Sequence, residues 1–241
     1  MLNVIIPAAG LGKRFKEVGF ELPKPLIDVL GKPMIAHVLE EYREGTVTLL
    51  FRKEHLEEYP EKFSDLHEKF AFRVLKVPKV TEGAACTVLE AYNFINNDDE
   101  LLITNSDQLV GQKSVEDFIA FCREHKADGG VMCFSNQSPK WSYAAIREDG
   151  TIERIVEKQV ISTNATTGVY YFRRGQDFVR AATQMIVADD RVNGEFYVAP
   201  TYNYLIKEGM RILPFEIEES EMHGLGTPED LQKFLEWKSQ N

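Results

Sequence analysis

The chain has 241 residues, of which 44% are hydrophobic and 27% charged, and its formal net charge is -10. This length and apolar content suffice for an α/β fold with a full core, so we predict a single domain over residues 1–241. The negative charge repels phosphate backbones and anionic lipids, which argues against nucleic acid or a membrane as a partner. Local cations must therefore bind any anionic ligand.

Cysteine usage and hydropathy bear on the compartment. The three cysteines, Cys86, Cys122 and Cys133, are widely spaced and form no Cys-x-x-Cys pair, so we interpret them as small hydrophobic residues in a reducing compartment. No apolar run approaches the ~20 residues of a membrane span. Met1 leads directly into an apolar strand without a basic leader. We expect a cytoplasmic protein.

The first thirty residues contain a candidate phosphate-binding loop. An apolar run over residues 2–6 predicts a buried strand, and Lys13, Arg14 and Lys24 follow it. The loop lacks the third glycine of the dinucleotide fingerprint and the Gly-Lys-Ser/Thr of the P-loop, and Gly-x-Gly also occurs in ordinary strand-to-loop transitions. Prolines on both sides of Lys24 are harder to explain by packing. The strand ends in small residues that let backbone N–H groups approach an anion: Ala8, Ala9, Gly10 and Gly12.

Apolar periodicity predicts the remaining elements. We predict helices over residues 33–43, 54–70, 113–125 and 178–186, with further helices beginning near residues 83, 193 and 228. We predict strands over residues 47–51, 72–77, 100–104, 129–134, 168–172 and 211–215. Two more strands, over residues 143–146 and 152–156, should form a hairpin across Asp149-Gly150, a common two-residue turn.

Polar residues follow the apolar strand over residues 100–104. Ligands of open α/β sheets collect at the carboxyl ends of strands, so Asp107 is a candidate ligand for Mg²⁺. Mg²⁺ commonly takes one or two protein carboxylates and completes its shell with water and phosphate oxygens. The alternative is that Asp107 caps the following turn.

Two segments resemble the signature of the sugar-1-phosphate nucleotidyltransferases, the pyrophosphorylases that make nucleotide sugars. They are Pro-Ala-Ala-Gly-Leu-Gly-Lys-Arg-Phe over residues 7–15 and Pro-Lys-Pro-Leu over residues 23–26. The similarity extends through residues 104–107, 157–158, 167–172 and 226–230, and thus covers nearly the whole chain. Residues 83–88, 141–143 and 193–197 are similar to a short branch of that family linked to capsular and surface polysaccharide synthesis.

The resemblance implies a three-layer α/β/α fold with a mixed, mainly parallel sheet. It also implies a nucleotide-binding part over roughly residues 1–112 and an acceptor-binding part over roughly residues 113–241. The implied reaction joins a nucleoside triphosphate to a sugar 1-phosphate or similar small phosphate ester and releases pyrophosphate, with Mg²⁺ as cofactor. Arg14, Lys24 and Asp107 are the implied catalytic residues, and Asp107 also binds the metal.

The resemblance further assigns residues to two subsites. Close helix-to-strand packing could also explain Gly83 and Ala84, and core packing could also explain Tyr143. The nucleotide subsite is formed by Ala8, Ala9, Gly10, Gly12, Lys13, Gly83 and Ala84. The acceptor subsite is formed by Tyr143, Glu157, Lys158, Asn164, Thr167 and Glu195.

The chain departs from the family pattern at Gly224. Most relatives have an aspartate there, two residues before Gly-Thr-Pro, as a second metal carboxylate. His223 could replace it, although imidazole is a poorer Mg²⁺ ligand than carboxylate. Three outcomes are open: Asp107 holds the metal with substrate oxygens and water, His223 takes part, or activity is lost.

The competing functions are a glycosyltransferase on the same fold and a degenerate nucleotide-binding module. The nucleobase, the acceptor and the oligomeric state are left open.

Overall fold

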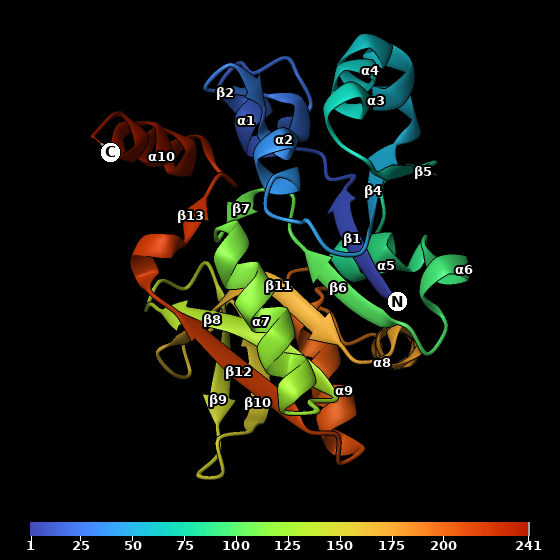
Figure 1. Cartoon of the computed structure of the whole chain (residues 1–241), viewed down its shortest axis with the longest axis vertical. Helices are drawn as coiled ribbons and strands as arrows, with labels where there is room; N and C mark the ends of the chain where they lie inside the picture. Colours follow the sequence, from blue (N-terminus) through green and yellow to red (C-terminus); the bar gives the residue numbers. More distant parts are fainter. Residues whose placement is uncertain (241) are drawn as a thin grey trace.

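A nine-stranded mixed sheet forms the centre of the computed structural model, which describes residues 1–240 (Figure 1). Its strands are β1 (Leu2–Ala8), β4 (Thr46–Arg52), β5 (Arg73–Val77), β6 (Glu100–Thr104), β8 (Gly129–Ser135), β9 (Ser142–Ile146), β10 (Ile152–Glu157), β11 (Asn164–Phe172) and β12 (Ile212–Ile217). The order is β10-β9-β11-β6-β1-β4-β5, with β8 pairing to β11 and β12. Strands β6, β1, β4 and β5 are parallel, whereas β11 is antiparallel to β6 and β8.

Helices cover both faces of this sheet. They are α1 (Lys13–Glu17), α2 (Met34–Leu39), α3 (Lys53–Glu58), α4 (Pro60–Lys69), α5 (Ala84–Leu89), α6 (Tyr92–Ile95), α7 (Gln112–Glu124), α8 (Gly175–Val187), α9 (Tyr202–Lys207) and α10 (Pro228–Gln240). Short 3₁₀ turns span Lys24–Leu26, Ala199–Thr201 and Glu219–Glu221. None of the helices in residues 1–240 combines the length and the apolarity needed to cross a membrane.

Alternation along β1 explains the two-sided core. Val4 and Ile6 belong to the buried cluster that includes α2 and α7, whereas Ile5 belongs to the cluster that includes α5, α8 and α9. Successive side chains of a strand point to opposite faces, so the consecutive apolar residues Val4, Ile5 and Ile6 contribute to both layers. The predicted three-layer α/β fold is thus confirmed.

Two short ribbons lie outside the main sheet. Strand β2 (Asp28–Val29) pairs with β3 (Lys32–Pro33), and β7 (Gln108–Leu109) pairs with β13 (His223–Gly224). The second ribbon brings the segment after β6 against the chain that leads into α10 (Figure 1). This contact places residues more than a hundred positions apart at the same edge of the sheet.

Two predicted helices differ from the structure. The helix predicted over residues 54–70 is broken between α3 and α4, because Pro60 cannot donate an N–H and instead begins α4. No helix begins at Asn193, because Asn193 and Gly194 have positive φ angles of 51° and 80°. They form a tight turn closed by a bridge between Val192 and Glu195. Helical structure starts only at Ala199.

Candidate active site

A cavity of about 620 Å³ opens beside the carboxyl ends of β1 and β6. Its walls come from the loop after β1, the start of α5, the segment after β6, the β9–β10–β11 region and the approach to α10. The predicted site residues that line it are Ala8, Ala9, Gly10, Gly12, Lys13, Arg14, Lys24, Gly83, Ala84, Asp107, Glu157, Lys158 and Glu195. Most of the predicted nucleotide and acceptor residues therefore share one space.

The loop after β1 presents unneutralised cations. Gly12 adopts a left-handed φ of 61° and begins α1, which was not predicted and which carries Lys13 and Arg14. A Cβ on Gly12 would lie 3.2 Å from the Cβ of Lys24, so its absence lets the Lys24 turn pack against this loop. Within residues 1–240, the side chains of Lys13 and Arg14 form no hydrogen bond or ion pair. Their charges are therefore available to a phosphate ligand.

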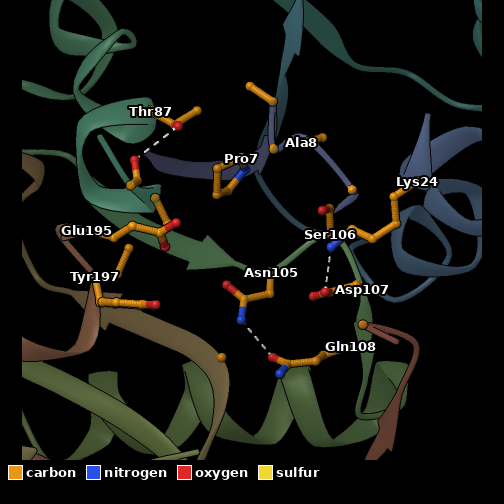
Figure 2. A pocket seen from close by; sticks show the side chains of 18 of the residues that line it. Pro7, Ala8, Lys24, Thr87, Asn105, Ser106, Asp107, Gln108, Glu195 and Tyr197 are labelled. Atoms are coloured by element: carbon orange, nitrogen blue, oxygen red, sulfur yellow. Dashed lines mark hydrogen bonds and ion pairs between the residues drawn. The ribbon is translucent and has the colours of Figure 1, made fainter. Parts of the chain in front are cut away.

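Lys24 and Asp107 form an ion pair in the wall of the cavity. The Lys24 Nζ donates to Asp107 Oδ2 at 2.6 Å, and each side chain is only about one-fifth exposed (20% and 19%) (Figure 2). Pro23 and Pro25 confine the backbone around Lys24, and Pro25 is buried. The backbone carbonyl of Asp107 accepts from the N–H of Leu225 at 2.7 Å. A cation and a carboxylate 83 residues apart are thus held together at the expected reaction centre.

A pair of amides beside Asp107 was not predicted as part of the site. Asn105 Nδ2 donates to Gln108 Oε1 at 2.8 Å, and both residues line the cavity (Figure 2). The pair lies across Gly168, whose φ is 86° and whose added Cβ would lie 1.9 Å from Gln108 Oε1. The only sequence signal for these amides is that they follow a buried strand, where ligands commonly bind.

Gly168→Ala should destabilise the chain more than Gly150→Ala. Both glycines have similar positive φ angles, 86° and 81°, but a Cβ at Gly150 meets nothing within 4 Å. The backbone strain is therefore matched, and the difference reports the collision with the amide pair. Overpacking of this kind costs about 1–3 kcal/mol. Urea unfolding measures both variants, and equal free energies of unfolding would show that the amide pair moves aside freely.

The wall formed by residues predicted to bind the acceptor combines a buried carboxylate with a restrained lysine. Glu157 is 8% exposed and accepts a hydrogen bond from the Ser142 hydroxyl. Burial raises the pKa of Glu157, and the hydrogen bond from Ser142 opposes that shift. Lys158 Nζ donates to the Tyr197 hydroxyl at 2.7 Å and lies 4.8 Å from the centre of its ring. Tyr197 therefore fixes the direction of Lys158 within the cavity.

Tyr143 and Asn164 do not line the cavity. Tyr143 is fully buried in a cluster with Phe134, and its hydroxyl donates to the Ser138 carbonyl at 2.7 Å. Asn164 Nδ2 donates to the Ala144 carbonyl at 3.3 Å. The Tyr143 hydroxyl thus bonds the loop between β8 and β9, and the Asn164 amide joins β11 to β9, so core packing explains Tyr143.

Thr167 also lies away from the cavity, because its side chain points to the opposite face of β11 from the residues that line the cavity. It is fully buried, and its hydroxyl donates to the Met132 carbonyl at 3.3 Å. The cavity is lined instead by Thr166, Gly168 and Tyr170 of the same strand. Alternate residues of a strand face opposite sides, so a shift of one residue decides which threonine meets a ligand.

His223 does not reach the cavity. It is half-buried, its ring centroid lies 4.0 Å from that of Trp237 and 5.5 Å from that of Phe234, and burial lowers its pKa. The carboxylate that faces the cavity beside Gly224 is that of Asp230, whose Oδ2 lies 3.7 Å from where a Gly224 Cβ would be. Asp230 was not among the predicted site residues.

The carboxylates that line the cavity are the candidate ligands for Mg²⁺. No group of three or more His, Cys, Asp or Glu side chains suited to a metal occurs in the described part of the chain. Asp107 and Asp230 both line the cavity, paired with Lys24 and Lys140 at 2.6 and 2.7 Å. One or two carboxylates fit Mg²⁺ where phosphate oxygens and water complete the shell.

Comparison with known protein families decides the assignment. The nucleotidyl transferase model matches residues 3–216, which include the loop after β1, Lys24, Asp107 and Lys158. The chain belongs to the nucleotidyl transferase family. Sequence relatives include the bifunctional protein GlmU of Aquifex aeolicus, 30% identical over 251 residues that cover 95% of this chain and 52% of that protein. A mannose-1-phosphate guanyltransferase of Gibberella zeae is 28% identical over 179 residues, 70% of this chain and 48% of that protein.

This nucleotidyl transferase chain spans about half the length of the curated relatives it matches. Solved structures support the fold. A nucleoside-diphosphate-sugar pyrophosphorylase from Vibrio cholerae RC9 has a TM-score of 0.81 at 24% identity and covers 97% of this chain and 99% of its own. A UDP-glucose pyrophosphorylase complexed with UDP-glucose has a TM-score of 0.80 at 17% identity, with coverage of 100% and 99%.

Proposed function

We propose that this chain transfers a nucleotidyl group from a nucleoside triphosphate to a sugar 1-phosphate or a similar small phosphate ester and releases pyrophosphate. The observation that carries the proposal is the arrangement of cations around one cavity. Lys13 and Arg14 of α1, Lys24 paired with Asp107, and Lys158 restrained by Tyr197 all line this cavity. Two polyanions must approach each other in this reaction, so cations are needed on both sides of the reacting centre.

The side chains suggest how the reaction proceeds. An oxygen of the acceptor phosphate attacks the α-phosphorus in line. The bond between the α-phosphorus and the oxygen that bridges it to the β-phosphate breaks, and pyrophosphate leaves with that oxygen. Arg14 would bind the departing phosphates, Lys24 the α-phosphate, and Lys158 the acceptor phosphate. A phosphate dianion is already a nucleophile, so no protein base is required. Catalysis then depends on positioning and charge neutralisation.

We propose that Asp107 and Asp230 would hold Mg²⁺ in this cavity. Bound Mg²⁺ supplies positive charge that neutralises phosphate oxygens. Asp107 and Asp230 face the cavity, whereas His223 is packed against aromatic rings outside it. Lys24 and Lys140 pair with these carboxylates, and their ammonium groups would pair with phosphate oxygens when substrates bind.

Asp230→Asn should raise the Mg²⁺ concentration needed for half-maximal rate by at least about tenfold, because one of two carboxylates is lost. Direct Mn²⁺ binding measured by electron paramagnetic resonance provides a readout that does not depend on turnover. The control is Glu229→Gln, because Glu229 is exposed and does not line the cavity. Unchanged metal affinity in Asp230→Asn would show that Asp107 suffices with substrate oxygens and water.

A screen of the common nucleoside triphosphates against sugar 1-phosphates and other phosphate esters tests the function. We expect pyrophosphate only when both substrates and Mg²⁺ are present. A glycosyltransferase would instead consume a nucleotide sugar without releasing pyrophosphate, and a degenerate module would bind nucleotide without turnover. The similarity at residues 83–88, 141–143 and 193–197 supports a cytoplasmic role in capsular or surface polysaccharide synthesis as part of this proposal.

A further inference from the structure

Two consecutive residues after α2 hold both ends of the segment that carries Asp107. The Tyr42 hydroxyl donates to Thr104 Oγ1 at 2.5 Å, at the end of β6. The Glu41 carboxylate accepts from the backbone N–H groups of Val110, at 3.0 Å, and Gly111, at 2.8 Å, just before α7. Asp107 lies between these two points of attachment, so the segment that directly follows α2 is hydrogen-bonded to both flanks of the Asp107 loop.

Glu41 is an unusual group to find in this position. It is only 7% exposed and forms no ion pair within residues 1–240. Burial raises its pKa to about 7, and nearby Glu40 acts in the same direction, whereas the two N–H donors lower it. An apolar side chain would fill this space without the cost of burying a charge. A carboxylate, however, can accept from two adjacent backbone N–H groups at once.

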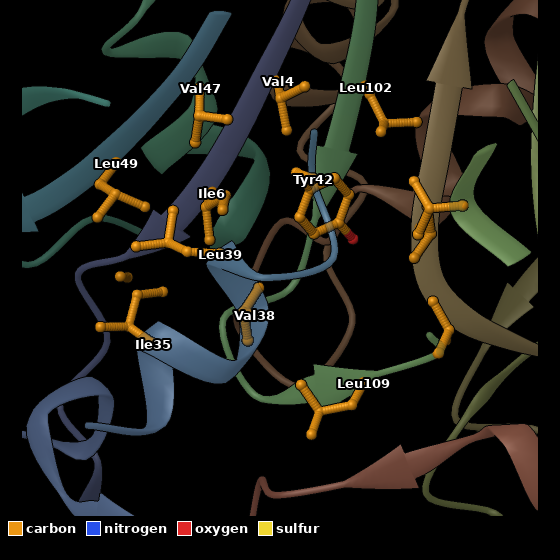
Figure 3. Close-up of a cluster of buried hydrophobic side chains, with 14 of the residues drawn as sticks. Val4, Ile6, Ile35, Val38, Leu39, Tyr42, Val47, Leu49, Leu102 and Leu109 are labelled. Carbon is orange, nitrogen blue, oxygen red and sulfur yellow. The ribbon is translucent and has the colours of Figure 1, made fainter. Parts of the chain in front are cut away.

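The same helix is also connected to Lys24. The N–H of Met34, the first residue of α2, donates to the Ile27 carbonyl at 2.8 Å, directly after the 3₁₀ turn that begins at Lys24. Val38, Leu39 and Leu109 belong to one buried cluster (Figure 3). Helix α2 therefore links the two partners of the Lys24–Asp107 pair through packed and hydrogen-bonded contacts.

We propose that Glu41 is a positioning residue that holds the loop over residues 105–109 so that Asp107 stays against Lys24. The inference rests on the proposed function. Glu41 does not line the cavity and touches no reacting atom, so it acts only through the geometry of Asp107. Misplacement of a reacting group by about 1 Å can lower a rate by about a hundredfold.

Glu41→Gln tests this inference, because glutamine keeps the size and one acceptor oxygen but loses the charge and places an N–H₂ group where Oε2 accepts from the Val110 N–H at 3.2 Å. We expect kcat to fall by about tenfold or more, with little change in KM for the nucleotide. Glu40→Gln is the control, since Glu40 pairs with Lys32 and does not line the cavity. Equal kcat values for Glu41→Gln and wild type would overturn the proposal.

A double-mutant cycle separates positioning from general damage. If Glu41 acts through Asp107, then Glu41→Gln causes little further loss of kcat in an Asp107→Asn background. Multiplicative losses would overturn the proposal.

Because the folded pKa of Glu41 is raised, the stability it contributes is lost as the pH rises through about 7. A neutral glutamine has no such pH dependence, so the stability of wild type relative to Glu41→Gln should decrease as the pH rises through about 7.

Amide hydrogen exchange gives a readout that does not need turnover. In Glu41→Gln the amides of Val110 and Gly111 should exchange faster, while those of β1 and β4 stay protected. Should this variant fail to fold, Tyr42→Phe removes only the bond to Thr104 and should lower kcat less, in the same direction. Unchanged exchange and unchanged kcat would contradict the inference. If wild type releases no pyrophosphate with any substrate pair, the proposed function fails, and exchange still decides whether Glu41 holds this loop.

Discussion

Lys24→Ala and Asp107→Ala should each lower the rate of pyrophosphate release at least ~100-fold, the scale expected when one aligned charge is removed from a transition state. Lys24 is held between prolines and lies 2.6 Å from Asp107, so its ammonium needs little reorganisation to meet the α-phosphate. In Lys24→Ala the carboxylate of Asp107 also loses its ion-pair partner and would repel the incoming phosphates.

Steady-state assays with saturating substrates measure this effect, and nucleotide affinity is measured separately by isothermal titration. Lys16→Ala is the control, because Lys16 is an exposed lysine of α1 that does not line the cavity. Its turnover should stay within about twofold of wild type. Near-normal turnover in Lys24→Ala or Asp107→Ala would refute the role assigned to that residue. A urea unfolding curve for each variant verifies that it is folded under the assay conditions.

The second large effect is expected at Lys158. Lys158→Ala should lower kcat/KM for the acceptor about 100-fold and leave the affinity for the nucleotide nearly unchanged, because Lys158 lines the cavity in the proposed acceptor subsite. Tyr197→Phe removes only the hydrogen bond that directs Lys158 and should lower kcat/KM less. The effect of Lys158→Ala should be the larger because that variant loses the ammonium charge, whereas Tyr197→Phe keeps the charge and loses only the hydrogen bond that orients it.

Another lysine of the chain provides a matched control for Lys158. Lys207 lies 4.9 Å from the ring centre of Tyr204, against 4.8 Å for Lys158 and Tyr197, but it lies outside the cavity. Lys207→Ala should therefore keep kcat/KM within about twofold of wild type. Competition by inorganic phosphate gives an independent readout, since Lys158→Ala should weaken inhibition at the acceptor subsite. Equal losses toward nucleotide and acceptor would show that Lys158 has no preference between the subsites.

Local patterns predicted the elements whose cause is local. The apolar run of β1, the small residues after it and the prolines around Lys24 are all read within thirty residues, and the structure brings them to one cavity. The hairpin across Asp149-Gly150 is confirmed by the pairing of β9 with β10. The helix predicted at Asn193 was wrong although Asn193-Gly194 is a common turn pair, because the apolar residues beyond it suggested a helical face.

Local patterns were enough to predict the α/β class, the small-residue loop after β1 and the cations Arg14 and Lys24 near it, because glycine, proline and charge act through local backbone freedom and composition. The role expected of Lys158 came from the resemblance to the nucleotidyltransferases. The three-dimensional arrangement was needed to show that Thr166 rather than Thr167 lines the cavity from β11. It was also needed to show that the Asp230 carboxylate faces the cavity near Gly224, that the His223 ring packs against Trp237, and that Glu41 accepts from two N–H groups just after the Asp107 loop. These outcomes depend on strand register and on contacts between residues far apart in the chain, which no local pattern records.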